Sequence, residues 1–139
     1  MRGLVWFTHM GFPESRYPLK GTYTAQSPTL FKKVKYDEDE IWNEIERICA
    51  EDEEGKFTPG QQMFYNIPFF TNPKIFRDIE LERIINEYYL CTRLNIPFSR
   101  DLDSSSAFRL QCFSIIHTEV IALENRKIEI QRKDANKHR

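Results

Sequence analysis

The chain has 139 residues, of which 40% are hydrophobic, and its 20 Lys and Arg against 21 Asp and Glu give a formal net charge of −1 at pH 7. A chain of this length buries one hydrophobic core, so we expect a single domain over residues 1–139. The near-neutral charge excludes a global electrostatic attraction to nucleic acid or to an anionic membrane, so any such binding must be local.

Cysteine usage and the first residues predict a protein that works inside a cell. Cys49, Cys91 and Cys112 are odd in number and have no close pair, which indicates neither a disulfide framework nor a Cys-rich zinc site. The apolar run 4–7 is too short for a signal-peptide core or a membrane span. We therefore expect a cytoplasmic protein without a membrane partner, located in the host cytoplasm if it is viral, with association with a virion left open.

Charge is distributed along the chain in blocks. Residues 1–36 hold six basic residues against one acid, a balance of +5, and residues 37–54 hold ten acids against Arg47, a balance of −9. Residues 126–139 hold six basic residues against two acids, a balance of +4. The alternation of sign predicts charge complementarity, either within the molecule or with a partner.

Residues 1–36 form the basic arm, which we expect to be rich in β-structure. Short segments at 4–7, 21–25 and 30–36 hold aromatic, Thr or Val residues and are separated by prolines, as is typical of strands in a small sheet or ribbon. Aromatics interleaved with cations such as Lys32, Lys33 and Lys35 also suit a platform for single-stranded nucleic acid. Burial of the rings in a core, or their use as anchors on a partner, are the alternatives.

Residues 37–55 predict an acidic helix. Asp37 is placed to cap it, with Glu40 as its third residue, and Gly55 ends it. Ile41, Trp42, Ile45, Ile48 and Cys49 share one face, and the opposite face is acidic. That acidic face is either simply solvated or a mimic of nucleic acid. The residues that would carry the second role are Glu44, Glu51, Asp52, Glu53 and Glu54.

Residues 56–139 form the helical region. Thr58-Pro59-Gly60-Gln61 predicts the start of a short helix, and Asn72-Pro73 predicts the start of a long one that ends before Pro97. The Asp- and Ser-rich stretch 101–106 supplies caps for a second long helix. We therefore expect a helical hairpin over 73–133, and an α+β, mainly α fold for the whole chain.

The second hairpin helix has more apolar surface than one core-facing stripe requires. Leu110, Phe113, His117 and Ile121 lie beside the main stripe and widen it. Such residues must sit at the centre of a bundle or be covered by another chain. The predicted partner contacts are Tyr88, Tyr89, Phe98, Phe108, Phe113, Ile116 and Ile121.

Catalytic patterns find little support in the sequence. His9, His117 and His138 are far apart and follow no metal-binding spacing, and the five glycines form no phosphate loop. Carboxylate pairs such as Asp101 and Asp103 are typical of turns and surfaces. We expect no enzymatic activity, no metal and no cofactor.

Residues 87–119 carry a resemblance to a known family. The residues concerned are Glu87-Tyr88-Tyr89-Leu90-Cys91, Leu94-Asn95-Ile96-Pro97-Phe98, Asp101-Leu102-Asp103, Phe113, Ile115-Ile116 and Glu119. This pattern resembles the C-terminal part of small tail or baseplate assembly chaperones of tailed bacteriophages. The resemblance implies a non-enzymatic, mostly helical adaptor that masks a structural protein until assembly.

The sequence therefore predicts a protein-binding adaptor, a phage tail or baseplate assembly chaperone or a structural component, whose partner is a virion structural protein. One alternative is a small host-directed regulator or inhibitor that uses the acidic helix as a nucleic-acid mimic. Another is a nucleic-acid-binding protein that uses the basic arm and the basic residues of 126–139. The oligomeric state stays open, a homo-oligomer included.

Overall fold

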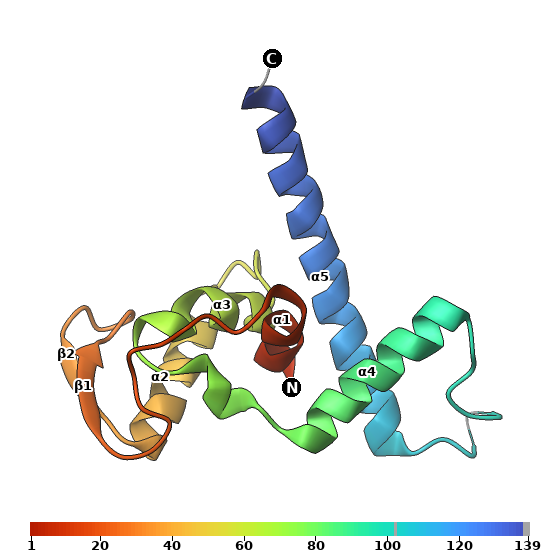
Figure 1. Cartoon of the computed structure of the whole chain (residues 1–139), viewed down its shortest axis with the longest axis horizontal. Coiled ribbons are helices and arrows are strands. Elements are labelled where there is room, and N and C mark those ends of the chain that lie inside the picture. Colours follow the sequence, from red (N-terminus) through yellow and green to blue (C-terminus); the bar gives the residue numbers. More distant parts are fainter. Residues whose placement is uncertain (102, 138–139) are drawn as a thin grey trace.

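The computed structural model describes residues 1–101 and 103–137 and is mainly helical (Figure 1). Leu102, His138 and Arg139 lie outside the described residues. The α+β, mainly α class is confirmed. The elements are α1 (Arg2–Met10), β1 (Tyr23–Gln26), β2 (Lys33–Tyr36), α2 (Glu38–Ala50), α3 (Pro59–Asn66), the 3₁₀ turns η1 (Ile67–Phe69) and η2 (Pro73–Phe76), α4 (Ile79–Leu94) and α5 (Ala107–Lys137).

Helix α1 corrects the prediction of a strand at residues 4–7. Its residues Gly3 to Phe7 are all buried, so the run shows no amphipathic period. A short, fully buried apolar segment cannot be assigned to helix or strand from periodicity alone. Leu4 and Val5 pack against α4 and α5. Phe7 belongs instead to the cluster that contains residues of β1, β2 and α2. Helix α1 thus lies between two hydrophobic clusters and joins them.

The basic arm contains one antiparallel hairpin, shorter than predicted. Strands β1 and β2 pair with Tyr23 opposite Tyr36 and Ala25 opposite Val34. Ala25 and Tyr36 are buried in the same cluster as Ile41 and Ile45 of α2. The aromatic residues of the arm are therefore not all buried. Tyr17 and Tyr36 lie in the core, whereas Phe31 is 81% exposed.

Helices α2 and α3 begin where the capping residues predict. The Asp37 carboxylate accepts a hydrogen bond from the Glu40 N–H at 2.8 Å, and Thr58 Oγ1 accepts one from the Gln61 N–H at 3.2 Å. Helix α2 ends at Ala50, before Gly55, which adopts a positive φ of 64° in the turn that follows.

Helix α4 begins later than predicted. Asn72 caps only η2, accepting a hydrogen bond from the Lys74 N–H, because Arg77 then returns to an extended conformation. Asp78 is the cap of α4 and accepts from the Leu81 N–H at 2.9 Å. The C-terminal end is as predicted, with Asn95 in the left-handed conformation two residues before Pro97.

Helices α4 and α5 cross and then diverge, so the predicted hairpin is not a pair of helices that lie side by side along their length (Figure 1). The first half of α5 packs on α1, α3 and α4. Its C-terminal part extends away from the rest of the molecule (Figure 1), and residues 127–137 are all exposed.

The Glu119 carboxylate connects three separate parts of the chain. Glu119 is fully buried on α5 and accepts hydrogen bonds from Trp6 Nε1 at 2.8 Å, Thr58 Oγ1 at 2.5 Å and the Gly60 N–H at 3.2 Å. Arg2 completes the set as an ion pair at 3.2 Å. A Cβ at position 60 would overlap the same carboxylate and lie 2.7 Å from the Arg2 carbonyl oxygen, so a glycine is needed there.

A second buried carboxylate, Glu44, holds the hairpin onto α2. It was predicted to lie on the acidic face, and this is wrong because the helix turns it towards the chain that joins β1 and β2. Its oxygens accept from Ser27 Oγ, Thr29 Oγ1 and Tyr36 Oη at 2.5–3.0 Å, and from Arg47 Nη2 at 2.5 Å. Burial alone would raise the pKa of Glu44, but the hydrogen bonds from Thr29, Arg47, Ser27 and Tyr36 outweigh it and leave that pKa lowered.

We predict that Glu119→Gln lowers the free energy of unfolding by about 3 kcal/mol, because the amide places an N–H among donors that need an acceptor. Urea unfolding followed by circular dichroism measures this. Glu124→Gln, at an exposed position on the same helix, is the matched control and should change stability by less than about 0.5 kcal/mol. Equal effects of the two substitutions would contradict the role given to Glu119.

We also predict that Glu44 makes folding acid-sensitive. A lowered folded-state pKa contributes stability that is present above the unfolded-state value, about 4.3 for Glu, and is lost as the pH falls through the folded-state pKa. Glu44→Gln should therefore flatten the dependence of unfolding free energy on pH below about 5. Glu46→Gln, at an exposed position on α2, should leave that dependence as steep as in the wild type.

Candidate protein-binding surface

A cluster of aromatic side chains fills the crossing of α4 and α5. The Phe113 ring lies 4.7 Å from the Phe98 ring and 5.6 Å from the Tyr88 ring, the latter edge to face. Tyr88 Oη and His117 Nδ1 are 2.7 Å apart, within hydrogen-bond distance. These contacts fix the connection between the two helices against α5, because Phe98 belongs to that connection.

A second set of polar contacts joins α4 to α1 and α5 at the surface. Tyr89 Oη lies 3.2 Å from His9 Nδ1, and Lys127 Nζ lies 2.5 Å from His9 Nε2. Partial burial, and then the charge of Lys127, lower the pKa of His9. Because an ammonium can only donate, His9 Nε2 is the acceptor in the contact with Lys127, and the His9 ring links α1 to α4 and α5.

The structure divides the seven predicted contact residues into three groups. Ile116 is fully buried and Tyr88 is 7% exposed, so both were wrongly placed at a partner surface, because α1 and the facing turns of α4 and α5 cover them. Tyr89, Phe98 and Phe113 are half-buried in the contacts just described. Phe108, at 61% exposed, and Ile121, at 45% exposed, remain available. The wide apolar surface predicted for α5 is thus partly covered by other segments of the same chain.

Three further apolar residues are exposed at the C-terminal end of α4, and the sequence reasoning missed them. Leu90 and Leu94 are each 57% exposed, and Ile96 is 52% exposed. The signal was available, because Leu90 and Leu94 are four residues apart and lie off the stripe that starts at Leu81. Together with Phe108 in the first turn of α5, they are four large exposed apolar side chains in the part of the chain that runs from the end of α4 into α5. We call this part the α4–α5 end: residues 90–101 and 103–108.

The residues of the alternative acidic surface do not form one continuous face. Glu51, Glu53 and Glu54 are exposed after α2, and Glu54 forms an ion pair with Lys56 at 2.5 Å. Asp52 is half-buried and accepts from the Phe57 N–H at 2.6 Å; this backbone hydrogen bond is the main cause that lowers its pKa. With Glu44 inside the molecule, the remaining acids lie in a turn and not along a helix.

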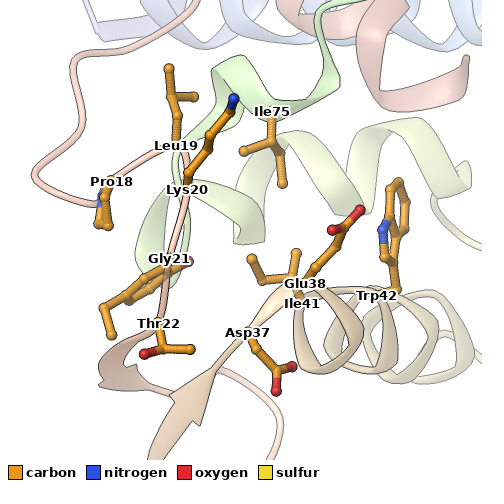
Figure 2. A pocket seen from close by; sticks show the side chains of 11 residues that line it. Pro18, Leu19, Lys20, Gly21, Thr22, Asp37, Glu38, Ile41, Trp42 and Ile75 are labelled. Atoms are coloured by element: carbon orange, nitrogen blue, oxygen red, sulfur yellow. The ribbon is translucent and has the colours of Figure 1, made fainter.

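A hollow of about 680 Å³ lies elsewhere, between the segment 18–23 and the N-terminal half of α2. Figure 2 shows Pro18 to Thr22 on one side and Asp37, Glu38, Ile41 and Trp42 on the other, with Ile75 beside them. Trp42, predicted to share the apolar face of α2 with Ile41 and Ile45, is 49% exposed. Its ring packs edge to face on Phe76 at 5.8 Å and leaves one side open.

We predict that Phe113→Ala lowers the free energy of unfolding by about 2 kcal/mol, since it removes the ring that joins Phe98 to Tyr88. Phe108→Ala, on the same helix but 61% exposed, should cost less than about 0.5 kcal/mol. Chemical denaturation of both variants gives the comparison. A large loss for Phe108→Ala would show that Phe108 belongs to the core and is not free for a partner.

Within residues 1–101 and 103–137, no group of three or more His, Cys, Asp or Glu side chains is placed to hold a metal ion. Over the same residues, no helix has both the length and the apolar character that crossing a bilayer requires. Comparison with known proteins gives no further guide: no protein-family model, no curated protein and no solved structure matches this chain.

Proposed function

We propose that this chain is a non-enzymatic adaptor whose α4–α5 end is covered by another protein. The observation that carries the proposal is the group of four large apolar side chains, Leu90, Leu94, Ile96 and Phe108, each more than half exposed in this part of the chain. Several large apolar residues exposed within one short part of the chain favour a protein interaction site, whereas isolated ones are common on any protein.

The interior of the molecule supports a binding role more than a catalytic one. Both fully buried carboxylates, Glu44 and Glu119, accept hydrogen bonds from several fixed donors and tie elements together. His117 lies against Tyr88 Oη, and the exposed His9 against Tyr89 Oη and Lys127 Nζ. The two carboxylates are fully buried, whereas a general acid or base must lie within hydrogen-bond reach of a substrate.

The partner that we propose is a structural protein of a virus particle, and the role is that of a tail or baseplate assembly chaperone or a component of the particle. This part of the proposal rests on the resemblance within residues 87–119, and the residues that carry it include three of the four exposed apolar residues, Leu90, Leu94 and Ile96. An adaptor of this kind binds an apolar segment until assembly buries it elsewhere. The working location would be the host cytoplasm.

The test is affinity capture from infected cells with the full chain as bait. Leu90→Gln/Leu94→Gln should lose a partner that the wild-type chain retains, because two exposed apolar contacts become polar. Ile79→Gln is the matched control, since Ile79 is 84% exposed on the same helix at its opposite end; it should retain the partner.

Two outcomes would contradict the proposal. One is a partner retained equally by all three baits, which would place the contact away from the α4–α5 end. The other is capture that disappears after nuclease treatment, which would favour a nucleic-acid-binding function for the basic residues.

A further inference from the structure

The charge blocks of the sequence do not neutralise one another within the molecule. Among the described residues, no ion pair joins the acidic block 37–54 to the basic arm or to the basic end of α5. The acidic block pairs mainly with its own Arg47, which binds Glu40 and Glu44. The C-terminal end of α5 forms no such ion pair because it lies far from α2 (Figure 1).

The acidic side has a defined surface on α2. Glu38, Trp42 and Glu46 are four residues apart, so they form one stripe along the helix, and all three are exposed. We call this the α2 stripe. In the described part of the chain no cation pairs with either of its glutamates. The hollow of Figure 2 lies beside it, with Ile41 and Ile75 as apolar lining and the open side of Trp42 as one wall.

The basic side is the projecting end of α5, residues 127–137. Ile130, Lys133 and Lys137 are three and four residues apart and form one face, with Ile130 38% exposed. Ile128 is a further exposed apolar residue there, at 46%. Neither lysine pairs with a carboxylate in the residues that the structure describes. The α5 face therefore presents one isoleucine and two lysines, and the α2 stripe presents one tryptophan between two glutamates. The charges of the two surfaces are opposite in sign.

We propose that the hollow beside Trp42 and the α2 stripe bind the projecting end of α5 from a second copy of this chain. The two surfaces match in kind: an isoleucine enters the apolar hollow, and Lys133 and Lys137 meet Glu38 and Glu46. Lys20, on the opposite wall of the hollow, opposes a second cation there and directs the lysines towards the stripe. This association does not involve the α4–α5 end.

The association is head to tail, because each copy offers one stripe and one helix end, and these are different surfaces. Such contacts do not stop at a dimer unless a ring closes. The wild-type chain should therefore show a weight-average mass that rises above 16.7 kDa with concentration. In sedimentation equilibrium the mass should return to that of one chain in about 1 M salt, where charges are screened beyond about 3 Å.

Two charge-reversed variants test the surfaces separately. Glu38→Lys/Glu46→Lys and Lys133→Glu/Lys137→Glu should each stay at the mass of one chain. An equimolar mixture of the two should associate again, because each reversed surface meets its reversed counterpart and the two native surfaces also meet. Asp103→Lys, exposed in the connection between α4 and α5, is the charge control and should associate as the wild type does. Thermal unfolding checks that each variant is folded.

Tryptophan fluorescence gives a second readout. Trp6 is fully buried and Trp42 is half-exposed, so a blue shift on association reports on Trp42. A wild-type chain that keeps the mass of one chain at every concentration would overturn the proposal. So would a mixture of the reversed variants that does not associate, or an association that nuclease removes, which would assign the basic end to nucleic acid. The Leu90→Gln/Leu94→Gln variant should self-associate as the wild type does, even though it loses the partner of the α4–α5 end.

Discussion

The fold depends on one buried carboxylate. Glu119 lies on α5, yet its hydrogen-bond donors come from the first helix and from the turn that begins α3, so three distant parts of the chain meet at one charge. A buried carboxylate is costly unless several donors satisfy it. Once satisfied, it fixes the first half of α5 against the body. Further along α5, Leu123 is buried and Arg126 and Lys127 still contact Tyr65 and His9, whereas residues 128–137 are all exposed.

Much of the fold could be predicted from local rules. Asp37 and Thr58 cap the helices that their sequence contexts indicate, and Pro97 follows the end of α4. Residues 4–7 were assigned wrongly because a run buried on all sides has no period to measure. Helix α4 was extended back to Pro73 because Asn72 and Asp78 are both good caps, and only the packed structure shows which of them starts the long helix.

The candidate surface was less predictable, for a physical reason. A helical stripe shows which residues share a face, but it does not show which faces the chain itself covers. Phe113 is partly covered by Phe98, which lies between α4 and α5, where no helical period indicates which way a side chain faces. Ile116 is covered by the first helix, an element that was predicted as a strand. Leu90 and Leu94 were overlooked because the charged residues around them indicated a solvated side.

The central claim is that the α4–α5 end is the surface that another protein covers. Hydrogen–deuterium exchange of the chain alone and with its captured partner tests this most directly, because it maps contact without any substitution. The account predicts slower exchange confined to the last turns of α4, the connection 95–106 and the first turn of α5. Slower exchange at the hairpin or α2 instead, with the α4–α5 end unchanged, would contradict it.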